Sequence, residues 1–281
     1  FETGSGLSRY SYRIDRFSNY YEFNNGTIGF PIGQDKGKVS REEAEQTYGT
    51  PFNAFTTVQL NAAFVGDNSF SGLTSPLDGF RYRLGIENYM GDFKLSALTA
   101  DGRRYVRLKP ITLAARLYTY SRFGRDESRL FQMYAGNGFL IRGYEANSFY
   151  KNNGSAPTNG FDINQLVGSR IAVANFEIRL PFTGPAKLAQ IASKFLFSDL
   201  NLFFDMGLAY DSDSKVAFHR QPQMVGTGAG AYPERVPAMS TGISLRVNVF
   251  GYFVLEPYYA IPFQRSDIKA GVFGLTFAPG W

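Results

Sequence analysis

The sequence has no cysteine and a single histidine among its 281 residues. The lack of cysteine excludes a disulfide framework, a thiol nucleophile and a cysteine-based metal site. The chain also lacks any apolar run that approaches the roughly 20 residues a membrane-spanning helix needs. If this chain crosses a membrane, it must therefore do so with strands.

Motifs for catalysis are missing as well. The sequence contains no Gly-x-Ser-x-Gly elbow, no glycine-rich phosphate loop and no His-Glu-x-x-His pattern. His219 lies in a polar stretch, where a solvated side chain is a better interpretation than a metal ligand or a general base. We therefore expect no enzyme activity, no cofactor and no metal site.

Charge of either sign is sparse and spread out. The net charge is +5, and the lysine and arginine residues are scattered rather than clustered. A protein that binds nucleic acid usually gathers basic residues on one face, so we expect no nucleic-acid partner. The first residues show no charged segment followed by an apolar one, which predicts a mature or truncated chain.

What the sequence does contain is a long series of alternating apolar and polar residues. From Phe52 onward, the pattern occupies residues 52–64, 80–87, 111–118, 172–180, 200–210, 239–249, 253–263 and 273–281. Alternation with a period of two predicts strands with one apolar and one polar face. Several of these stretches exceed the five or six residues of an ordinary soluble strand.

The polar faces of these predicted strands carry charged side chains, which separates two kinds of β protein. A soluble sandwich or lipocalin-like barrel also has alternating strands, but unpaired charge in its packed core is very costly. The wet interior of a membrane barrel can hold such residues. We therefore predict an all-β fold, a transmembrane antiparallel β-barrel whose polar face includes Arg81, Arg83, Arg116, Glu177, Arg179, Asp205, Arg246 and Glu256.

Nine strands can be recognised from Phe52 onward, and one or two more are expected before it. Residues 93–106 lose their parity near Leu98, which predicts either a β-bulge there or a strand whose register is misassigned from the sequence. Because single-chain bacterial barrels close with an even number of strands, nine to eleven strands do not make an obvious closed barrel.

The first 50 residues have weaker patterns. Tyr10, Tyr12 and Ile14 alternate with polar residues as in the arm of a hairpin, and residues 20–23 could begin another strand. Ser40 has a glutamate three residues later, the spacing of a capping box, which predicts a short helix inside a long loop. A solvated, charged loop is the alternative interpretation.

A long connection at about residues 122–169 neither repeats nor alternates, and Gly136–Glu145 lies at its centre. Arg142 within it follows an apolar residue and precedes a glycine and a tyrosine, which suggests a loop folded back onto the protein. Asp205 and Glu177 lie on the polar faces of two consecutive predicted strands. A guanidinium could bridge both carboxylates with its rigid set of donors, either for a function or merely to pin the loop.

Two short stretches then point to a family. Residues 141–144, Ile-Arg-Gly-Tyr, and residues 203–207, Phe-Phe-Asp-Met-Gly, together resemble the signature motifs of the BamA-type superfamily of outer-membrane barrels. Those proteins assemble other proteins into the outer membrane or secrete them across it. The resemblance covers about residues 52–281. It implies a loop inside the barrel whose arginine pairs with carboxylates, and here that set is Arg142, Asp205, Glu177, Gly143, Tyr144 and Gly207.

The family resemblance also implies how much of the barrel this chain represents. Family members are built on sixteen strands, and Arg142 would lie in the sixth extracellular loop with five strands after it. On this pattern residues 1–281 are the C-terminal portion of one barrel domain, with the long infolded loop at about residues 122–169. The first several strands, and any periplasmic domain before them, would lie outside this sequence.

The last strand carries a further resemblance. Phe273, Leu275, Phe277 and Trp281 resemble the terminal recognition strand that outer-membrane barrels present to their assembly machinery, although a plain amphipathic strand is the alternative. Pro279 departs from the usual family ending and removes a hydrogen-bond donor from the strand. The ending from residue 256 resembles barrels of Bacteroidetes that follow a propeller domain.

The resemblance implies insertion, assembly or translocation of proteins at the bacterial outer membrane. Expected partners are outer-membrane lipids, cargo proteins, and periplasmic or lipoprotein subunits. Two other functions stay open from the residues alone. The barrel could be a membrane anchor or display platform for another domain or complex, or it could be a solute channel.

Overall fold

The computed structural model describes residues 1–10, 15–24, 27–48, 54–92, 94–127, 132–150, 161–265, 268 and 270–278. They belong to two compact units, one formed by Phe1–Gly4, Leu60–Asn88 and Lys94–Trp281, the other by Ser5–Gln59 and Tyr89–Phe93. Strands dominate this part of the chain, and its helices are too short or too polar to cross a membrane. The all-β prediction is confirmed.

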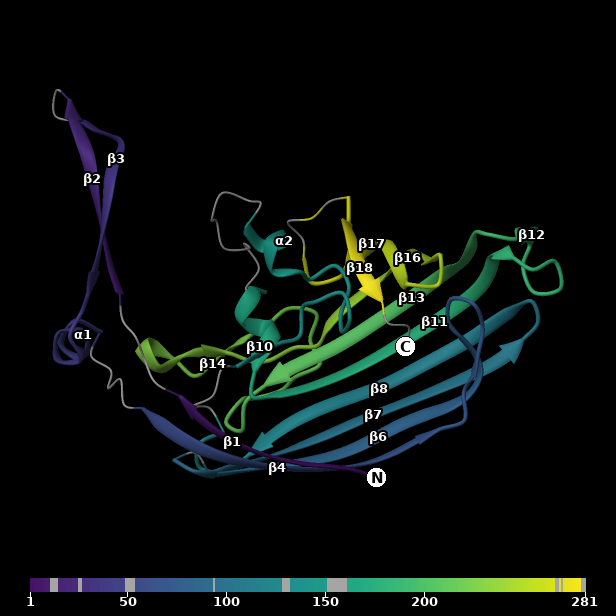
Figure 1. The fold of residues 1–281 in the computed structure, drawn as a ribbon, viewed down its shortest axis with the longest axis horizontal. Coiled ribbons are helices and arrows are strands. Elements are labelled where there is room, and N and C mark those ends of the chain that lie inside the picture. Colours follow the sequence, from purple (N-terminus) through teal and green to yellow (C-terminus); the bar gives the residue numbers. More distant parts are fainter. Residues whose placement is uncertain are drawn as a thin grey trace. The chain divides into compact units, whose positions relative to one another are not determined.

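Ten long strands follow one another in a single sheet within the described residues (Figure 1). Two short strands, β5 (Phe70–Ser71) and β12 (Ile191–Ala192), pair with its members. From β7 to β18 all neighbouring long strands are antiparallel. The order is β1 (Glu2–Tyr10), β4 (Phe55–Asp67), β6 (Pro76–Gly91), β7 (Leu95–Leu108), β8 (Ile111–Phe123), β11 (Arg170–Gly184), β13 (Phe197–Tyr210), β16 (Ala238–Val249), β17 (Phe253–Pro262) and β18 (Val272–Ala278).

This sheet matches the strands expected from the alternation. Nine of its long strands begin after Phe52 and one, β1, precedes them, within the part of the chain that the structure covers. Strands β6, β7, β8, β11 and β13 have 13 to 16 residues, which exceeds the roughly 9 to 11 that a tilted strand needs to cross a bilayer. The path of pairings has β1 at one end and β18 at the other.

The early part of the chain forms a hairpin and a helix. Strands β2 (Asp15–Asn24) and β3 (Thr27–Lys38) pair with each other, and residues 20–23 lie in β2. Helix α1 (Arg41–Tyr48) begins after Ser40, whose hydroxyl oxygen accepts a hydrogen bond from the Glu43 amide at 3.2 Å. The helix predicted from the capping-box spacing is therefore present. Tyr12 and Ile14 lie outside the described residues.

Each long strand after β7 has two chemically distinct faces. In β13 the Asn201 side chain is fully buried, whereas the adjacent Leu202 is 54% exposed. Asp205 is also buried and pairs directly with Asn175 of β11, so the two lie on the same side of the sheet. We call this polar side the inward face and the apolar side, with Leu202, the outward face.

Strand β7 differs from its predicted form. Its pairing with β8 runs without a register shift from Ser96 to Leu108, so the bulge expected near Leu98 is not found on that side. Leu98 is exposed on the outward face, whereas Leu95 and Ala97 are buried on the inward face. The apparent loss of parity arises because the first residues of β7 are apolar on both faces.

The long connection between β8 and β11 packs against the inward face. We call residues 124–169 the infolded segment; its described elements are β9 (Met133–Tyr134), α2 (Ala146–Tyr150), the 3-10 helix η1 (Ile163–Leu166) and β10 (Val167–Gly168). In Figure 1, α2 and β10 lie to the same side of β11 and β13. A buried apolar cluster joins this segment to the strands, with Ile141, Tyr144, Phe161 and Leu166 against Ile171, Val173, Ala209 and Ala238.

The connection between β13 and β16 contributes three smaller elements, β14 (Met224–Val225), the 3-10 helix η2 (Gly228–Gly230) and β15 (Tyr232–Pro233). Val236 from its end joins the apolar cluster under the infolded segment. The Gln165 amide of η1 also donates to the Glu234 carbonyl at 3.1 Å. Two long connections are therefore packed together over the inward face.

Candidate functional site

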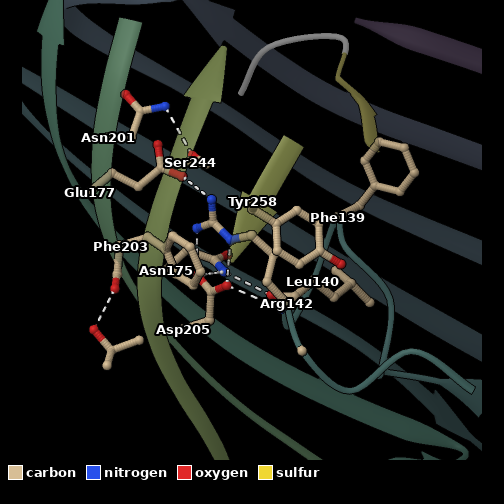
Figure 2. Close-up of polar contacts among 12 residues, drawn as sticks. Phe139, Leu140, Arg142, Asn175, Glu177, Asn201, Phe203, Asp205, Ser244 and Tyr258 are labelled. Carbon is tan, nitrogen blue, oxygen red and sulfur yellow. Dashed lines mark hydrogen bonds and ion pairs between the residues drawn. The ribbon is translucent and has the colours of Figure 1, made fainter. Parts of the chain in front are cut away.

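Arg142 lies just after a tight turn that Asn137 organises. The Asn137 carbonyl accepts from the amides of Leu140 and Ile141 at 3.0 and 2.8 Å, and its side-chain oxygen accepts from the Phe139 amide at 3.0 Å. Asparagine favours such turns because its side chain can bond to the backbone two residues later. The turn directs the Arg142 side chain down onto the inward face of the sheet (Figure 2).

Asp205 of β13 holds Arg142 through a bidentate pair. The guanidinium donates from Nε to Oδ2 at 2.7 Å and from Nη2 to Oδ1 at 2.8 Å. The Arg142 backbone amide also donates to Oδ2 at 3.2 Å. Only 3% of the arginine side chain and none of the carboxylate is exposed to solvent. This geometry is the strong form of a charge-assisted hydrogen bond because two parallel donors fix both the distance and the angle.

Two more carboxylates meet the far nitrogen of the same guanidinium. Arg142 Nη1 lies 2.9 Å from Oε1 of Glu177 on β11 and 3.0 Å from Oε1 of Glu256 on β17. The guanidinium carbon also lies 3.6 Å from the centre of the Phe203 ring, a cation–π contact. One side chain from the infolded segment thereby connects three strands of the sheet.

Two further arginines surround the carboxylates and balance their charge. Arg246 of β16 donates to Glu177 at 3.1 Å and to Glu256 at 2.9 Å. Arg179 of β11 donates to Glu177 at 2.8 Å. Three arginines and three carboxylates therefore form one buried network without net charge, which is the condition under which buried ions are tolerated.

Neutral polar groups complete the attachment. The Asn175 amide of β11 donates to Oδ1 of Asp205 at 2.8 Å and to the Leu140 carbonyl at 2.7 Å (Figure 2). It thus links the carboxylate to the turn that carries Arg142. The Ser244 hydroxyl donates to Glu256 at 2.7 Å and so orients that carboxylate.

Tyr144 anchors the infolded segment a second time, two residues beyond Arg142. Its buried hydroxyl donates to the Met239 carbonyl at 2.9 Å and to the side-chain oxygen of Gln264 at 2.6 Å. Burial raises the pKa of the Tyr144 phenol, so it stays protonated and acts as a donor.

Small residues allow the segment to approach the strands closely. Gly143 has a φ of +88°, and a Cβ at this position would lie 2.8 Å from the Ala260 side chain. A Cβ on Gly207 of β13 would lie 2.3 Å from the Ile141 side chain. Both positions therefore favour glycine, the first for conformation as well as space and the second for space alone.

The infolded segment also contacts the hairpin formed by β17 and β18. The Arg265 guanidinium, in the connection between these strands, donates to the side-chain and backbone oxygens of Ser148 at 3.0 and 3.1 Å. It also lies 3.8 Å from the Phe149 ring. Tyr258 of β17 bonds to the Glu145 carboxylate. These contacts add to the one between Arg142 and Glu256.

The structure thus brings together all six residues that the family motifs singled out in the loop and on the strands. Arg142 contacts Asp205 and Glu177 directly, and Gly143, Tyr144 and Gly207 lie at the contacts of the segment with the sheet. Sequence reasoning missed Glu256, Arg246 and Arg179 as members of the network. Their positions on polar faces were visible, but the register that brings them to one place was not.

The last strand points its apolar residues outward. Phe273, Leu275 and Phe277 of β18 are all more than half exposed, at 72%, 52% and 61%. They therefore share one side of the strand, as their alternate spacing predicts. Trp281, the fourth residue of the predicted recognition strand, lies outside the described residues.

Within the described ranges, no group of three or more histidine or carboxylate side chains is arranged to hold a metal ion. His219 contacts the carboxylate of Glu234 in the connection between β13 and β16. A guanidinium saturated by carboxylates provides neither a nucleophile nor a free base. What the network around Arg142 can do is hold one segment against four strands.

Comparison with known proteins gives one result. The model of the Omp85 superfamily domain matches residues 3–278 of this chain, nearly its whole length. This match confirms the BamA-type resemblance that the two motifs suggested. Among curated proteins, none matches the chain.

Proposed function

The chain belongs to the Omp85 superfamily, and from this premise we propose that it is a bacterial outer-membrane β-barrel that takes part in inserting proteins into that membrane or translocating them across it. The superfamily as a whole acts in protein insertion and translocation at outer membranes. The long strands with a charged inward face and an apolar outward face support a membrane location for this member.

The proposal rests on one observation. A buried guanidinium, Arg142, ties the infolded segment at once to Asp205, Glu177 and Glu256 on three strands. Such a network is expensive to desolvate, and packed apolar residues often stabilise a fold as well or better. Its presence therefore supports a role for the position of the segment itself, beyond the stability of the sheet.

We further propose that these strands are the C-terminal portion of a sixteen-stranded barrel. The ten-strand path, with five long strands after the infolded segment, supports this assignment. In such a barrel β18 would lie at the closing seam, and its outward row of Phe273, Leu275 and Phe277 would serve as the recognition strand during assembly of the protein itself. Periplasmic or lipoprotein partners would deliver the cargo.

The first test uses the full-length protein reconstituted into liposomes. An unfolded outer-membrane barrel is added as client, and its folding is followed by the shift in gel mobility that barrels show before and after heating. We expect these liposomes to fold the client faster than protein-free liposomes do. A correctly inserted barrel that gives no acceleration would instead support the anchor or display function.

The same liposomes also test the remaining alternative function, a solute channel. A solute channel needs an open, water-filled interior, whereas here the infolded segment and a closed charge network occupy the inward face. We expect little uptake of small sugars in a liposome-swelling assay. Rapid swelling at a rate typical of porins would overturn the insertion or translocation proposal in favour of a channel.

A further inference from the structure

Arg104 is a charged residue on the outward face of β7. Leu98, Val106 and Leu108 share its parity along the strand and are exposed, whereas Tyr105, of the other parity, is buried inward. Arg104 is itself exposed. The outward face of β7 therefore carries a positive charge with apolar residues on both sides of it along the strand.

The outward residues of the neighbouring strands that lie beside Arg104 are also apolar. Arg104 pairs with Ala115 of β8, Ala115 with Phe176 of β11, and Phe176 with Phe204 of β13. The next outward row toward the turn between β7 and β8 is also apolar, and it consists of Val106, Leu113, Ile178 and Leu202. Arg104 thus lies within the apolar band rather than beyond its edge.

No residue in the described part of the chain pairs with the Arg104 side chain. Its neighbour Arg103 points the other way and donates to Asp101 at 2.7 Å. A charge that faces lipid is costly near the bilayer midplane, and this cost falls toward the interfaces. An anionic group that pairs with the guanidinium lowers the cost further, because it neutralises the charge. The position therefore calls for an anionic partner from the surroundings.

A groove on the outward face begins at this arginine. It has a volume of about 520 Å³ and is lined by Arg104, Val106, Leu113, Ala115, Phe176 and Phe204, among others. Ala115, whose side chain is small, lies in this lining beside the larger Phe176 and Leu113. Two further outward grooves, one around Leu84 and Leu98 and one around Leu117 and Met206, have no charged side chain in their lining.

Depth decides which part of a lipid would reach the guanidinium. Strands β7 and β8 are joined by the short turn at Lys109 and Pro110, and short turns of outer-membrane barrels lie on the periplasmic side. Arg104 lies five residues before Lys109. At roughly 3.3 Å per residue and a strand tilt of about 40°, it is on the order of 13 Å above the turn. Its long side chain can extend down to the headgroup level of the periplasmic leaflet.

We propose that this groove binds an anionic phospholipid of the periplasmic leaflet. The phosphate accepts hydrogen bonds from the Arg104 guanidinium, whose planar set of donors fits phosphate oxygens. An acyl chain lies over Ala115 between Phe176 and Val106. The inference rests on the proposed membrane placement of the strands, but it concerns the outward face and does not depend on the network around Arg142.

Native mass spectrometry of the full-length protein in mild detergent tests the proposal, with phosphatidylglycerol and phosphatidylcholine of identical chains as probes. We expect the wild-type protein to retain phosphatidylglycerol about tenfold better, the factor that one charge-assisted hydrogen bond of about 1.4 kcal/mol provides. Arg104→Gln should abolish this preference, and Arg104→Lys should keep most of it. Arg125→Gln removes the same charge from an exposed position next to β8 and should leave the preference intact.

Ala115→Phe fills the groove while keeping the charge. It should lower retention of both lipids by a similar factor without changing the heat-modifiable mobility of the barrel. Equal retention of the two lipids by the wild-type protein would overturn the site. An unchanged preference for phosphatidylglycerol in Arg104→Gln would overturn it as well, even if that variant had lost the binding of a protein partner at this face. A wild-type protein without heat-modifiable mobility would instead contradict the membrane barrel, so the two failures are distinguishable.

Discussion

At the scale of single residues, Arg142 differs from a surface ion pair because every charge it meets is buried. The side chains of Asp205 and Glu177 have no exposed area, and that of Glu256 has 5%. An exposed ion pair contributes no more than about 1 kcal/mol to stability. Removing one member of a buried pair typically costs about 3 to 5 kcal/mol, because the partner is left uncompensated.

Arg142→Ala and Asp205→Ala are each expected to release the infolded segment. In Arg142→Ala, Asp205 loses its cationic partner, whereas Glu177 and Glu256 keep their ion pairs with Arg246. Each single variant should therefore increase protease cleavage within residues 124–169, measured on the folded protein in membranes. The double variant should be little worse than either single one, because both remove the same interaction.

Arg41→Ala is the control for these single and double variants. Arg41 pairs with Glu45 on the exposed surface of α1, four residues away, and such pairs contribute only a few tenths of a kcal/mol. Cleavage of the infolded segment should not change in this variant. Strictly additive cleavage rates for Arg142→Ala and Asp205→Ala would show that the two side chains do not act as one unit.

The residue types around Arg142 were only partly predictable. The family motifs give Asp205 and Glu177, because both lie on the polar parity of strands that follow each other in the sequence. Glu256 was identified as a polar-face residue, but its distance from Arg142 depends on the register of β16 with β17, in which Ser244 pairs with Tyr258. That register depends on the turn and on pairing along the whole strand, which alternation alone cannot supply.

At the scale of strands, alternation predicted the faces well because lipid and water select opposite side chains along the same strand. It failed on β7, where Leu95 and Ala97 are apolar but buried on the inward face. Their exposed fractions are 3% and 0%, so this part of the inward face is shielded from water and the polar half of the rule does not apply there.

The outward face is tested by Leu202→Arg in the middle of β13. Its side chain is 54% exposed on the apolar side, so a charge there faces lipid and costs about 2 to 4 kcal/mol near the midplane. We expect this variant to give little folded protein in membranes, judged by heat-modifiable gel mobility. Recovery at the wild-type level would contradict the membrane assignment of this face.

Asn61→Arg is the matched control, because Asn61 of β4 is exposed and shares the inward parity of the buried Ala63. A charge at this position can remain hydrated, so folding should be nearly unchanged. Asn201, next to Leu202, would be a poor control. It is fully buried and pairs directly with Arg179, so an arginine there would meet a like charge.

The hairpin of β17 and β18 is expected to depend on its contacts with the infolded segment. Arg265→Ala removes two hydrogen bonds to Ser148 and the contact with Phe149. Amide hydrogen exchange in residues 253–262 and 272–278 should become faster, since local opening follows the loss of packing at that end. Arg125→Ala changes an exposed arginine outside these contacts and should leave the amide exchange of the two strands unaltered.

Unchanged exchange in both variants would mean that the hairpin is held by its own pairing alone. In that case the infolded segment would be attached to the hairpin without supporting it.

At the scale of the whole chain, the infolded segment contacts strands that are far apart in the sequence. Arg142 reaches β11, β13 and β17, Tyr144 reaches β16, and Gly138 lies against Thr276 of β18. The pairing path ends at β18. A change in the segment can therefore be transmitted to the last strand, where the proposed barrel would close.

The fold class and the family followed from the sequence because they depend on local alternation and on two short motifs. The attachment of the segment to β17 and β18 did not, since Gln264, Arg265 and Ser148 belong to connections without any periodic pattern. Contacts between two loops depend on where the strands place their ends, which is a property of the complete sheet.

The central claim is that the position of the infolded segment, fixed by Arg142, is needed for function. It is tested most directly by measuring two quantities in the same liposomes containing full-length protein: protease cleavage of residues 124–169 and the folding rate of a client barrel. For Arg142→Ala we predict faster cleavage and a client folding rate reduced about tenfold or more, with heat-modifiable mobility retained. Arg142→Lys should be intermediate, because a lysine lacks the rigid fork that bridges several carboxylates. A segment that is cleaved freely while the client folds at the wild-type rate would contradict the claim and leave Arg142 as a structural pin.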